Sequence, residues 1–345
     1  MLIAPEVDPD APDIPTPRSY TEAITGPYSS QWQTAMDAEM ASWKSTRTYV
    51  DAVPPPWANI VDGMWIFRVK QPPGSPPAFK ARYVAQDFSQ QHGVDFFQTF
   101  SPTPKMTTLL VLLHVAAQRD YKLHSLDFNT PFLQDTLHEE IGLRRPPGFT
   151  RSFPAGTQWS LRRPFYGLGQ APREWHDTLG TVLAALGFAP STAGPSLFLR
   201  TGTLLPSFYV LVYVDDLVFA TADTEALALV KSEQQKRHTC TDLGELRNYL
   251  GLQITRDRAR RTITLTHSHM MHQSVEPSGP YPELVGFLMY LMTMSGMGLV
   301  LGGRCPVVLT GHADASWVDD LATQRSSQGY TFSLGSGSIS WRSTH

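Results

Sequence analysis

Residues 211–220, LVYVDDLVFA, place two adjacent carboxylates, Asp215 and Asp216, between two apolar runs. Both runs are strand-like and apolar, so the flanking strands should be buried in a sheet. Neighbouring side chains of a regular strand point to opposite faces, so adjacent acids can serve one site only where a tight turn relaxes that rule. The stretch therefore predicts a buried β-hairpin with the two aspartates at its tip.

The segments around this hairpin alternate between helical and strand-like patterns. Residues 29–45 carry large apolar side chains at helical spacing, with charges between them. Further helices are expected at 104–119, at 172–188 with Gly187 as the C-terminal cap, and at 223–238 with Asp223 or Thr224 as the N-terminal cap. Strand pairs are expected at 63–88 and at 249–267, the latter with a turn that carries Arg258, Arg260 and Arg261. The alternation predicts an α+β fold.

Net charge, cysteine content and the pattern of apolar residues limit what kind of protein this chain can be. The 28 Lys and Arg against 31 Asp and Glu give a net charge of -3, so a nucleic-acid partner would need a local basic groove. Cys240 and Cys305 match no zinc or disulfide spacing. The acidic, proline-rich N-terminal stretch lacks the features of a signal peptide, and residues 284–301 are interrupted by glycines. We expect a disordered tail and no membrane anchor.

A third carboxylate, Asp127 in HSLDFNTPFL, lies at the end of another predicted strand. For the Asp215–Asp216 pair alone, a plain turn is the stronger explanation, because Asp is a preferred turn residue. Three carboxylates on adjacent strand ends, however, could hold two divalent ions, which stabilise the attacking and leaving oxygens of phosphoryl transfer. Oxygen ligands of this kind favour Mg²⁺.

These residues belong to an ordered series of segments that resembles the reverse transcriptases of Ty1/copia-type retrotransposons. LVYVDDLVF is similar to the YxDD box of reverse transcriptases, and the whole series covers about residues 32–256. In chain order, its other members are WQTAMDAEM, WIFRVK, FKARYVAQDF, TFSPTPKMTTLLVLL, HSLDFNTPFL, EEIGLRRPPGF, FYGLGQAPREW, GFAPSTAGPSLFLR and DLGELRNYLGLQI. Residues 308–343 resemble the start of the copia ribonuclease H domain.

The resemblance implies a right-hand polymerase fold, with fingers and palm built from an antiparallel sheet packed on helices. It implies a disordered tail at 1–30, fingers and palm at 31–270, a shortened thumb or connection at 271–303, and an N-terminal fragment of a ribonuclease H-like domain at 304–345. Asp127, Asp215 and Asp216 would be the metal-binding triad, with Asp216 the more peripheral member. Asp314 would be the first ribonuclease H ligand, and we expect no ribonuclease H activity from this fragment.

Four further residues acquire roles from the resemblance. Lys80 and Arg82 would contact the triphosphate, Phe132 would block a ribose 2′-hydroxyl, and Gln170 would lie against the nucleotide sugar and template. Each has a plainer interpretation: exposed strand charges, a core aromatic and a surface amide, respectively. A basic region could track phosphates or form a solvated face; it comprises Arg144, Arg145, Arg151, Arg162, Arg163 and Arg173.

The implied activity is RNA-directed DNA polymerisation with Mg²⁺, or with Mn²⁺. The implied partners are an RNA or DNA template with its primer, a dNTP and the other parts of the element polyprotein, without a membrane. The family expectation for location is cytoplasmic particles that deliver product to the nucleus. Two alternatives remain, a catalytically impaired relic or domesticated nucleic-acid-binding protein and, less well supported, a metal-dependent nuclease. The histidines His267, His269 and His272 are interpreted as surface residues.

Overall fold

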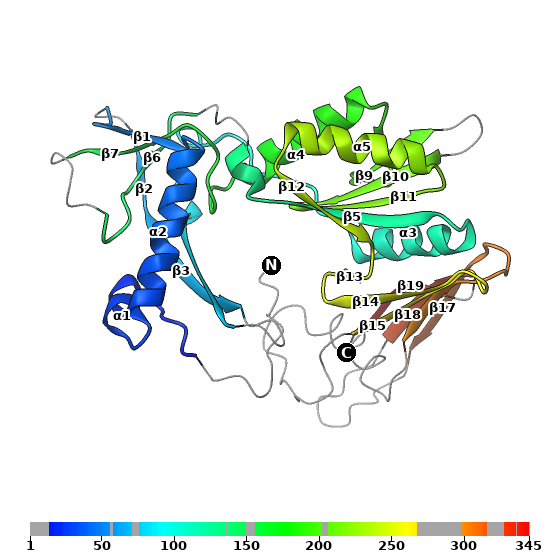
Figure 1. Ribbon diagram of the computed structural model, residues 1–345. Helices are drawn as coiled ribbons and strands as arrows, with labels where there is room; N and C mark the ends of the chain where they lie inside the picture. The colour runs from blue at the N-terminus through cyan, green and yellow to red at the C-terminus, as the bar shows by residue number, and fades with distance from the viewer. Residues whose placement is uncertain are drawn as a thin grey trace. The chain divides into compact units, whose positions relative to one another are not determined.

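The computed structural model describes residues 14–55, 58–70, 76–134, 137, 139–149, 156–201, 206–267, 298–315, 328–335 and 337–344. The chain divides into two compact units (Figure 1). Unit 1 consists of Met1–Pro102 and Phe128–Val182, and unit 2 consists of Thr103–Asp127 and Leu183–His345.

Unit 1 combines a long helix with a mixed sheet, in which β2 and β6 pair in parallel, and an antiparallel hairpin. The strands β1, β7, β6 and β2 form one sheet in that order, and β3 pairs with β4 in a separate hairpin. Its elements are α1 (Tyr20–Thr25), α2 (Ser29–Ser45), β1 (Tyr49–Ala52), β2 (Ile60–Val61), β3 (Gly63–Lys70), β4 (Ala78–Ala85), η1 (Asp87–Ser89), η2 (Pro131–Gln134), β6 (Gly142–Leu143), β7 (Gln158–Leu161) and most of α4 (Ala171–Ala185).

The core of unit 1 is aromatic. Trp43 of α2 is fully buried and its ring lies 4.9 Å from that of Phe165 and 5.6 Å from that of Trp159. Large aromatic side chains bury the most apolar surface per residue, so this cluster holds α2 against β4 and β7. The helix predicted for 29–45 and the strand pair within 63–88 are therefore confirmed.

The N-terminal segment corrects the prediction of a disordered tail over residues 1–30. Helix α1 lies inside that range, and α2 begins at Ser29. The Ser19 hydroxyl accepts a hydrogen bond from the Glu22 backbone N–H, which caps α1, and Ala23 is buried. Residues 1–13 lie outside the described part of the chain.

Unit 2 is built on a six-stranded antiparallel sheet with the strand order β12-β5-β11-β10-β9-β8. Helix α3 lies on one face of this sheet and α5 lies on the other (Figure 1). Successive side chains of β5 point to opposite faces and therefore meet different helices. Leu123 packs in the cluster that contains α3, whereas His124 Nδ1 lies 2.9 Å from Lys231 Nζ of α5. The elements are α3 (Met106–Gln118), β5 (Lys122–Phe128), β8 (Ala189–Ser191), β9 (Gly194–Thr201), β10 (Pro206–Tyr213), β11 (Asp216–Thr221), α5 (Thr224–Arg237) and β12 (Cys240–Glu245).

Two smaller sheets complete unit 2 and share the core of α3. Ile339 and Trp341 of the second sheet belong to the same buried cluster as Leu113 of α3 and Ile263 of the first. The first sheet contains β13 (Asn248–Tyr249), β14 (Leu252–Asp257), β15 (Thr262–His267) and β16 (Leu299–Gly302), and the second contains β17 (Leu309–Ala315), β18 (Gln328–Leu334) and β19 (Gly337–Thr344).

The predicted helices and strand pairs of unit 2 are confirmed. Asp223, not Thr224, caps α5, because its carboxylate accepts a hydrogen bond of 2.9 Å from the Ala226 N–H. Gly187 follows α4 with a φ of +82°, the left-handed geometry of a helix C-terminal cap. Residues 268–297, which include His269, His272 and most of the predicted thumb, lie outside the described residues. In the described part of the chain, no helix is both long and apolar enough to cross a membrane.

Candidate active site

The hairpin predicted from LVYVDDLVFA is present, with one difference in the position of its acids. Strands β10 and β11 pair until Tyr213 faces Asp216, so Val214 and Asp215 alone form the turn. Asp216 is the first residue of β11 rather than part of the turn. Val214 has a φ of +50°, which is unusual for a β-branched residue and marks local strain. The neighbouring Leu211 and Leu217 are fully buried and make the hairpin rigid.

Asp127 comes to the hairpin through the next strand of the sheet. Strand β11 pairs with β5 in a register that sets Asp216 directly opposite Asp127, one step beyond the pair Leu217 and Leu126. Side chains that face each other in this way have Cβ atoms about 5 Å apart. All three aspartates are partly buried within unit 2. The register therefore brings together the three acids that the sequence singled out.

The pKa of Asp216 reflects its burial and the charges of the other two aspartates. Burial, followed by the negative charges of Asp127 and Asp215, raises the pKa of Asp216 to about 7. A carboxyl group with an ordinary pKa near 4 would be ionised at neutral pH, whereas this one still holds a proton for part of the time. The cluster thus concentrates more negative charge than it can easily keep without a cation.

Two residues that sequence reasoning missed lie beside this cluster. Tyr249 of β13 is 5% exposed, and burial, followed by the charge of Asp216, raises the pKa of its phenol. Burial and then the charges of Asp242 and Asp127 raise the pKa of the Cys240 thiol to about 11. Neither residue stands at a spacing that marks it in the sequence, because β12 and β13 reach the site only through the tertiary fold.

The donor set suits Mg²⁺, but the side chains do not yet converge. Among the described residues, no three His, Cys, Asp or Glu side chains are close enough together to form a metal-binding group as they lie. Like-charged carboxylates repel one another until a cation neutralises them. Ion binding by these oxygens therefore stays a prediction, and it would require changes of side-chain rotamer on a backbone that is already in register.

Three of the predicted nucleotide-binding residues lie in one part of unit 1. Lys80 and Arg82 are alternate, exposed residues of β4. The Arg82 guanidinium lies 5.1 Å from the centre of the Tyr166 ring, and the Phe132 ring meets the same tyrosine edge-on at 5.6 Å. Glu39 of α2 balances the two cations: burial raises its pKa to about 7, and the charges of Arg82 and Lys80 oppose that rise. Tyr166 and Glu39 carried no signal in the sequence.

Gln170 is not a surface amide. It is 2% exposed, its Nε2 donates to the Asp95 carbonyl at 2.9 Å, and its Oε1 accepts from Gln90 Nε2 at 3.1 Å. The Gly169 N–H also donates to Gln90, at 2.8 Å. The plainer interpretation of Gln170 as an exposed residue is therefore wrong, and its contact with a nucleotide stays a prediction.

The basic region of unit 1 is held largely by internal partners. Arg145 is buried and its guanidinium lies 2.7 Å from the Asp51 carboxylate, so it does not form part of a solvated face. Arg144 lies 2.5 Å from Asp62 and is exposed. Arg151 lies outside the described residues. The number of arginines in this region suits binding to a phosphate backbone, but the ion pairs of Arg144 and Arg145 with carboxylates favour that role less.

Comparisons with known proteins agree on one family. Residues 48–277 match the family described as Reverse transcriptase (RNA-dependent DNA polymerase). The Retrovirus-related Pol polyprotein from transposon TNT 1-94 of Nicotiana tabacum is 27% identical over 400 residues, which cover 95% of this chain and 30% of that protein. The corresponding polyprotein from transposon RE2 of Arabidopsis thaliana is 30% identical over 394 residues, 95% of this chain and 27% of that protein.

The chain thus spans less than a third of the length of these curated relatives. Among solved structures, a foamy viral protease-reverse transcriptase in complex with ds DNA matches 91% of this chain and 56% of its own chain. That match has a TM-score of 0.46 and 11% sequence identity.

Proposed function

The chain belongs to the reverse transcriptase (RNA-dependent DNA polymerase) family, and from that premise we propose that it is the RNA-directed DNA polymerase region of a Ty1/copia-type Pol polyprotein. The observation that supports this most is the cross-strand register of Asp216 and Asp127, with Asp215 in the adjoining turn. The register places acids from two distant parts of the sequence at one end of a rigid sheet. A plain turn would not need the third acid.

The proposed reaction is attack by a primer 3′-hydroxyl on the α-phosphate of a dNTP, with pyrophosphate as the leaving group. Asp127, Asp215 and Asp216 would hold the metal ions, and two bound Mg²⁺ ions would stabilise the attacking and leaving oxygens. Mn²⁺ has the same preference for oxygen ligands. The contribution of this chain is to hold the backbones of Asp127 and Asp216 in register on paired strands, so that only side-chain rotamers remain to adjust when the ions and substrates bind.

Unit 1 would supply the contacts to the incoming nucleotide. Lys80 and Arg82 present adjacent positive charges that suit a triphosphate. Phe132, held against Tyr166, would limit the space next to the sugar. Gln170 would act by fixing the segment that contains Gln90 and Asp95, since its amide is already bonded there.

The other assignments rest on the resemblance alone. Residues 31–270 would form fingers and palm, 271–303 a shortened thumb or connection, and 304–345 the start of a ribonuclease H-like domain. Asp314 lies in β17, where its backbone faces Gly329 of β18. Template, primer, dNTP and the remaining parts of the polyprotein are the proposed partners.

Primer extension on an RNA template tests the proposal. With Mg²⁺ the protein should extend the primer, and Asp215→Asn should reduce the rate by about 100-fold or more, as for loss of a group that stabilises transition-state charge. Asp177→Asn, which removes an exposed carboxylate on α4, is the matched control and should leave extension unchanged.

Failure of the unmutated chain to extend the primer in either Mg²⁺ or Mn²⁺ would overturn the proposed activity. If the protein still bound the template–primer under those conditions, a nucleic-acid-binding relic would be the better description. Equal extension by Asp215→Asn would move the metal site away from this hairpin.

A further inference from the structure

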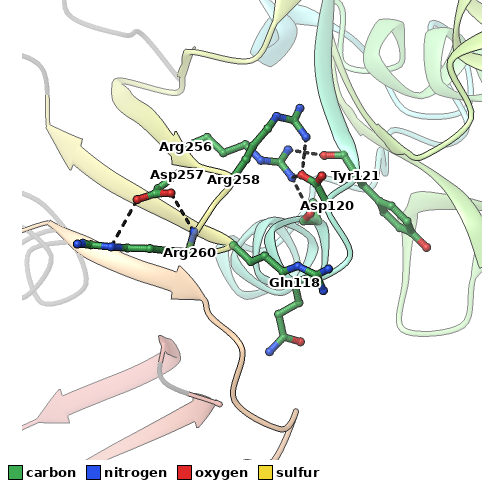
Figure 2. A network of polar contacts seen from close by, with 9 residues as sticks. Gln118, Asp120, Tyr121, Arg256, Asp257, Arg258 and Arg260 are labelled. Carbon is green, nitrogen blue, oxygen red and sulfur yellow. Dashed lines mark hydrogen bonds and ion pairs between the residues drawn. The ribbon is translucent and has the colours of Figure 1, made fainter.

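The turn between β14 and β15 carries a group of arginines that the polymerase site does not use. Together with two neighbouring segments it forms the arginine patch, which we define as Arg119, Arg258, Arg260, Arg261 and Arg304. Figure 2 shows how Arg258 and Arg260 extend from the hairpin beside the C-terminal end of α3. All five residues are exposed.

A sixth arginine, Arg256, anchors the hairpin beneath the patch. Its side chain is 10% exposed, and one of its guanidinium nitrogens, Nη2, donates to the Ala116 carbonyl at 3.1 Å and to the Asp120 carboxylate at 3.0 Å. Its Nη1 donates to the Tyr121 carbonyl (Figure 2). The Ala116 carbonyl also accepts a hydrogen bond of 2.9 Å from the Tyr121 N–H, so Arg256 adds a second donor at the end of α3 and fixes the hairpin there.

The exposed arginines are held in place by their other contacts. Arg261 Nη1 donates to the Gln118 carbonyl at 3.1 Å, and Arg304 Nη2 donates to the Ala259 carbonyl at 3.2 Å. Arg258 Nη1 donates to the Asp120 carboxylate. A guanidinium has five N–H donors, so these contacts orient each group and leave donors directed to solvent. The Arg260 side chain is 83% exposed.

The patch is positive in a protein that is negative overall. Among the residues that the structure describes, three carboxylates interact with the six arginines: Asp120 with Arg256 and Arg258, Asp257 with Arg260, and Glu245 with Arg256. Six positive charges against three negative ones leave an excess of three, whereas the whole chain carries -3. Positive charge gathered in this way attracts polyanions from a distance.

The patch lies at the opposite end of β5 from the candidate metal ligands. Tyr121, whose carbonyl accepts from Arg256, is six residues before Asp127. At about 3.3 Å per residue, an extended strand of that length spans roughly 20 Å. Six base pairs of a duplex cover about the same distance.

We propose that the arginine patch binds the phosphate backbone of a nucleic-acid duplex about 20 Å from Asp127. Arginine binds phosphate through paired N–H groups, and pre-oriented guanidinium groups lose less freedom on binding. The choice of a nucleic acid over an acidic protein segment rests on the proposed function, in which a duplex leaves the polymerase site. Contacts of this kind fix position and do not read sequence.

Salt-dependent binding in EDTA tests the patch separately from catalysis. The probes are a 20-base-pair RNA–DNA duplex and a hairpin with a six-base-pair stem, both followed by fluorescence anisotropy. Arg260→Gln combined with Arg304→Gln removes two patch charges, and Lys236→Gln combined with Arg237→Gln removes two exposed charges on α5 as the matched control. Thermal unfolding checks that both double variants remain folded.

For the long duplex, the slope of log affinity against log salt should decrease in magnitude by about 1 to 2 in the patch variant, because each lost phosphate contact removes nearly one released counterion. The control variant should show no such change, and the short hairpin, whose stem only just spans the distance to the patch, should show a smaller change than the long duplex. Equal slopes for the two double variants, or equal losses on both probes, would overturn the proposal. So would tighter binding of a poly-glutamate peptide than of a duplex of equal charge, which would assign the patch to an acidic protein.

These outcomes are distinguishable from failure of the proposed function. Absence of primer extension with a normal patch effect would remove the polymerase and keep the binding surface. Normal primer extension without an effect of the patch variant would support the polymerase and remove the proposed binding surface.

Discussion

Replacing Asp216 with asparagine should stabilise the protein in the absence of metal. Asp216 faces Asp127 across the β5–β11 ladder and adjoins Asp215, and its pKa is raised to about 7 by burial and by those two charges. Without a cation, ionising this group at neutral pH forces three carboxylates to share one end of the sheet. Asparagine has nearly the same shape but carries no charge, so it removes the repulsion.

The sign and size of the effect follow from the pKa. In the unfolded chain Asp216 has the ordinary value of 3.8, so between about pH 4 and 7 the folded state binds the proton more tightly. Stability contributed by that proton is fully present below pH 4 and is lost as the pH rises to about 7. The difference of about 3 pH units corresponds to at most roughly 4 kcal/mol, and solvent around a partly buried group brings the expected effect to about 2–4 kcal/mol.

Urea unfolding in EDTA from pH 5 to 8.5 measures this effect. The advantage of Asp216→Asn over the unmutated protein should be about a third of its full size at pH 5 and should reach about 2–4 kcal/mol above pH 7. Addition of Mg²⁺ should cancel most of that advantage, because a bound cation neutralises the cluster only when the carboxylate is present. A variant that is no more stable at pH 8 in EDTA, or an advantage that does not vary with pH, would refute the reasoning.

Two further predictions concern the turn and the buried amide. Val214→Gly should stabilise the protein by about 1 kcal/mol, because relief of strain at a φ of +50° exceeds the added freedom of the unfolded chain. Val214→Ala, which keeps the unfavourable φ, is the control. A lower urea midpoint for the glycine variant than for the unmutated protein would contradict this prediction. Gln170→Leu should destabilise by about 1–3 kcal/mol, since it leaves the buried Asp95 carbonyl and the Gln90 amide without their partner. If thermal unfolding shows no loss of stability in Gln170→Leu, water must replace the hydrogen bonds of the Gln170 amide.

The sequence predicted elements well where one local pattern governs them. Helix α2 follows from the spacing of Trp32, Met36, Met40 and Trp43, all of which are buried. The β10–β11 hairpin follows from two apolar runs around two acids. The pairing of this hairpin with the strand that carries Asp127 could not be predicted in the same way, because a register between strands about 90 residues apart depends on the whole sheet. The sequence pattern allowed these three acids to meet at adjacent strand ends, and the family resemblance implied that they do.

Predictions for single side chains failed where packing decided the outcome. Gln170 looked like a surface residue because glycine and proline surround it, yet its amide satisfies two groups of a separate segment. Its burial depends on the segment that contains Gln90 and Asp95, which approaches from 75 to 80 residues away. Nothing in the local sequence records that approach.

Arg256 shows that part of this information was available in the pattern. In β14 the inward-facing positions are Leu252, Ile254 and Arg256, so the arginine occupies a core position by the two-residue period of a strand. A guanidinium in such a position must find acceptors, because an unpaired buried charge is very costly. The carbonyls at a helix C-terminus are one kind of suitable acceptor. The pattern thus implied that Arg256 meets acceptors within the fold, but it did not identify the end of α3 as their source, and the arginine patch depends on that identity.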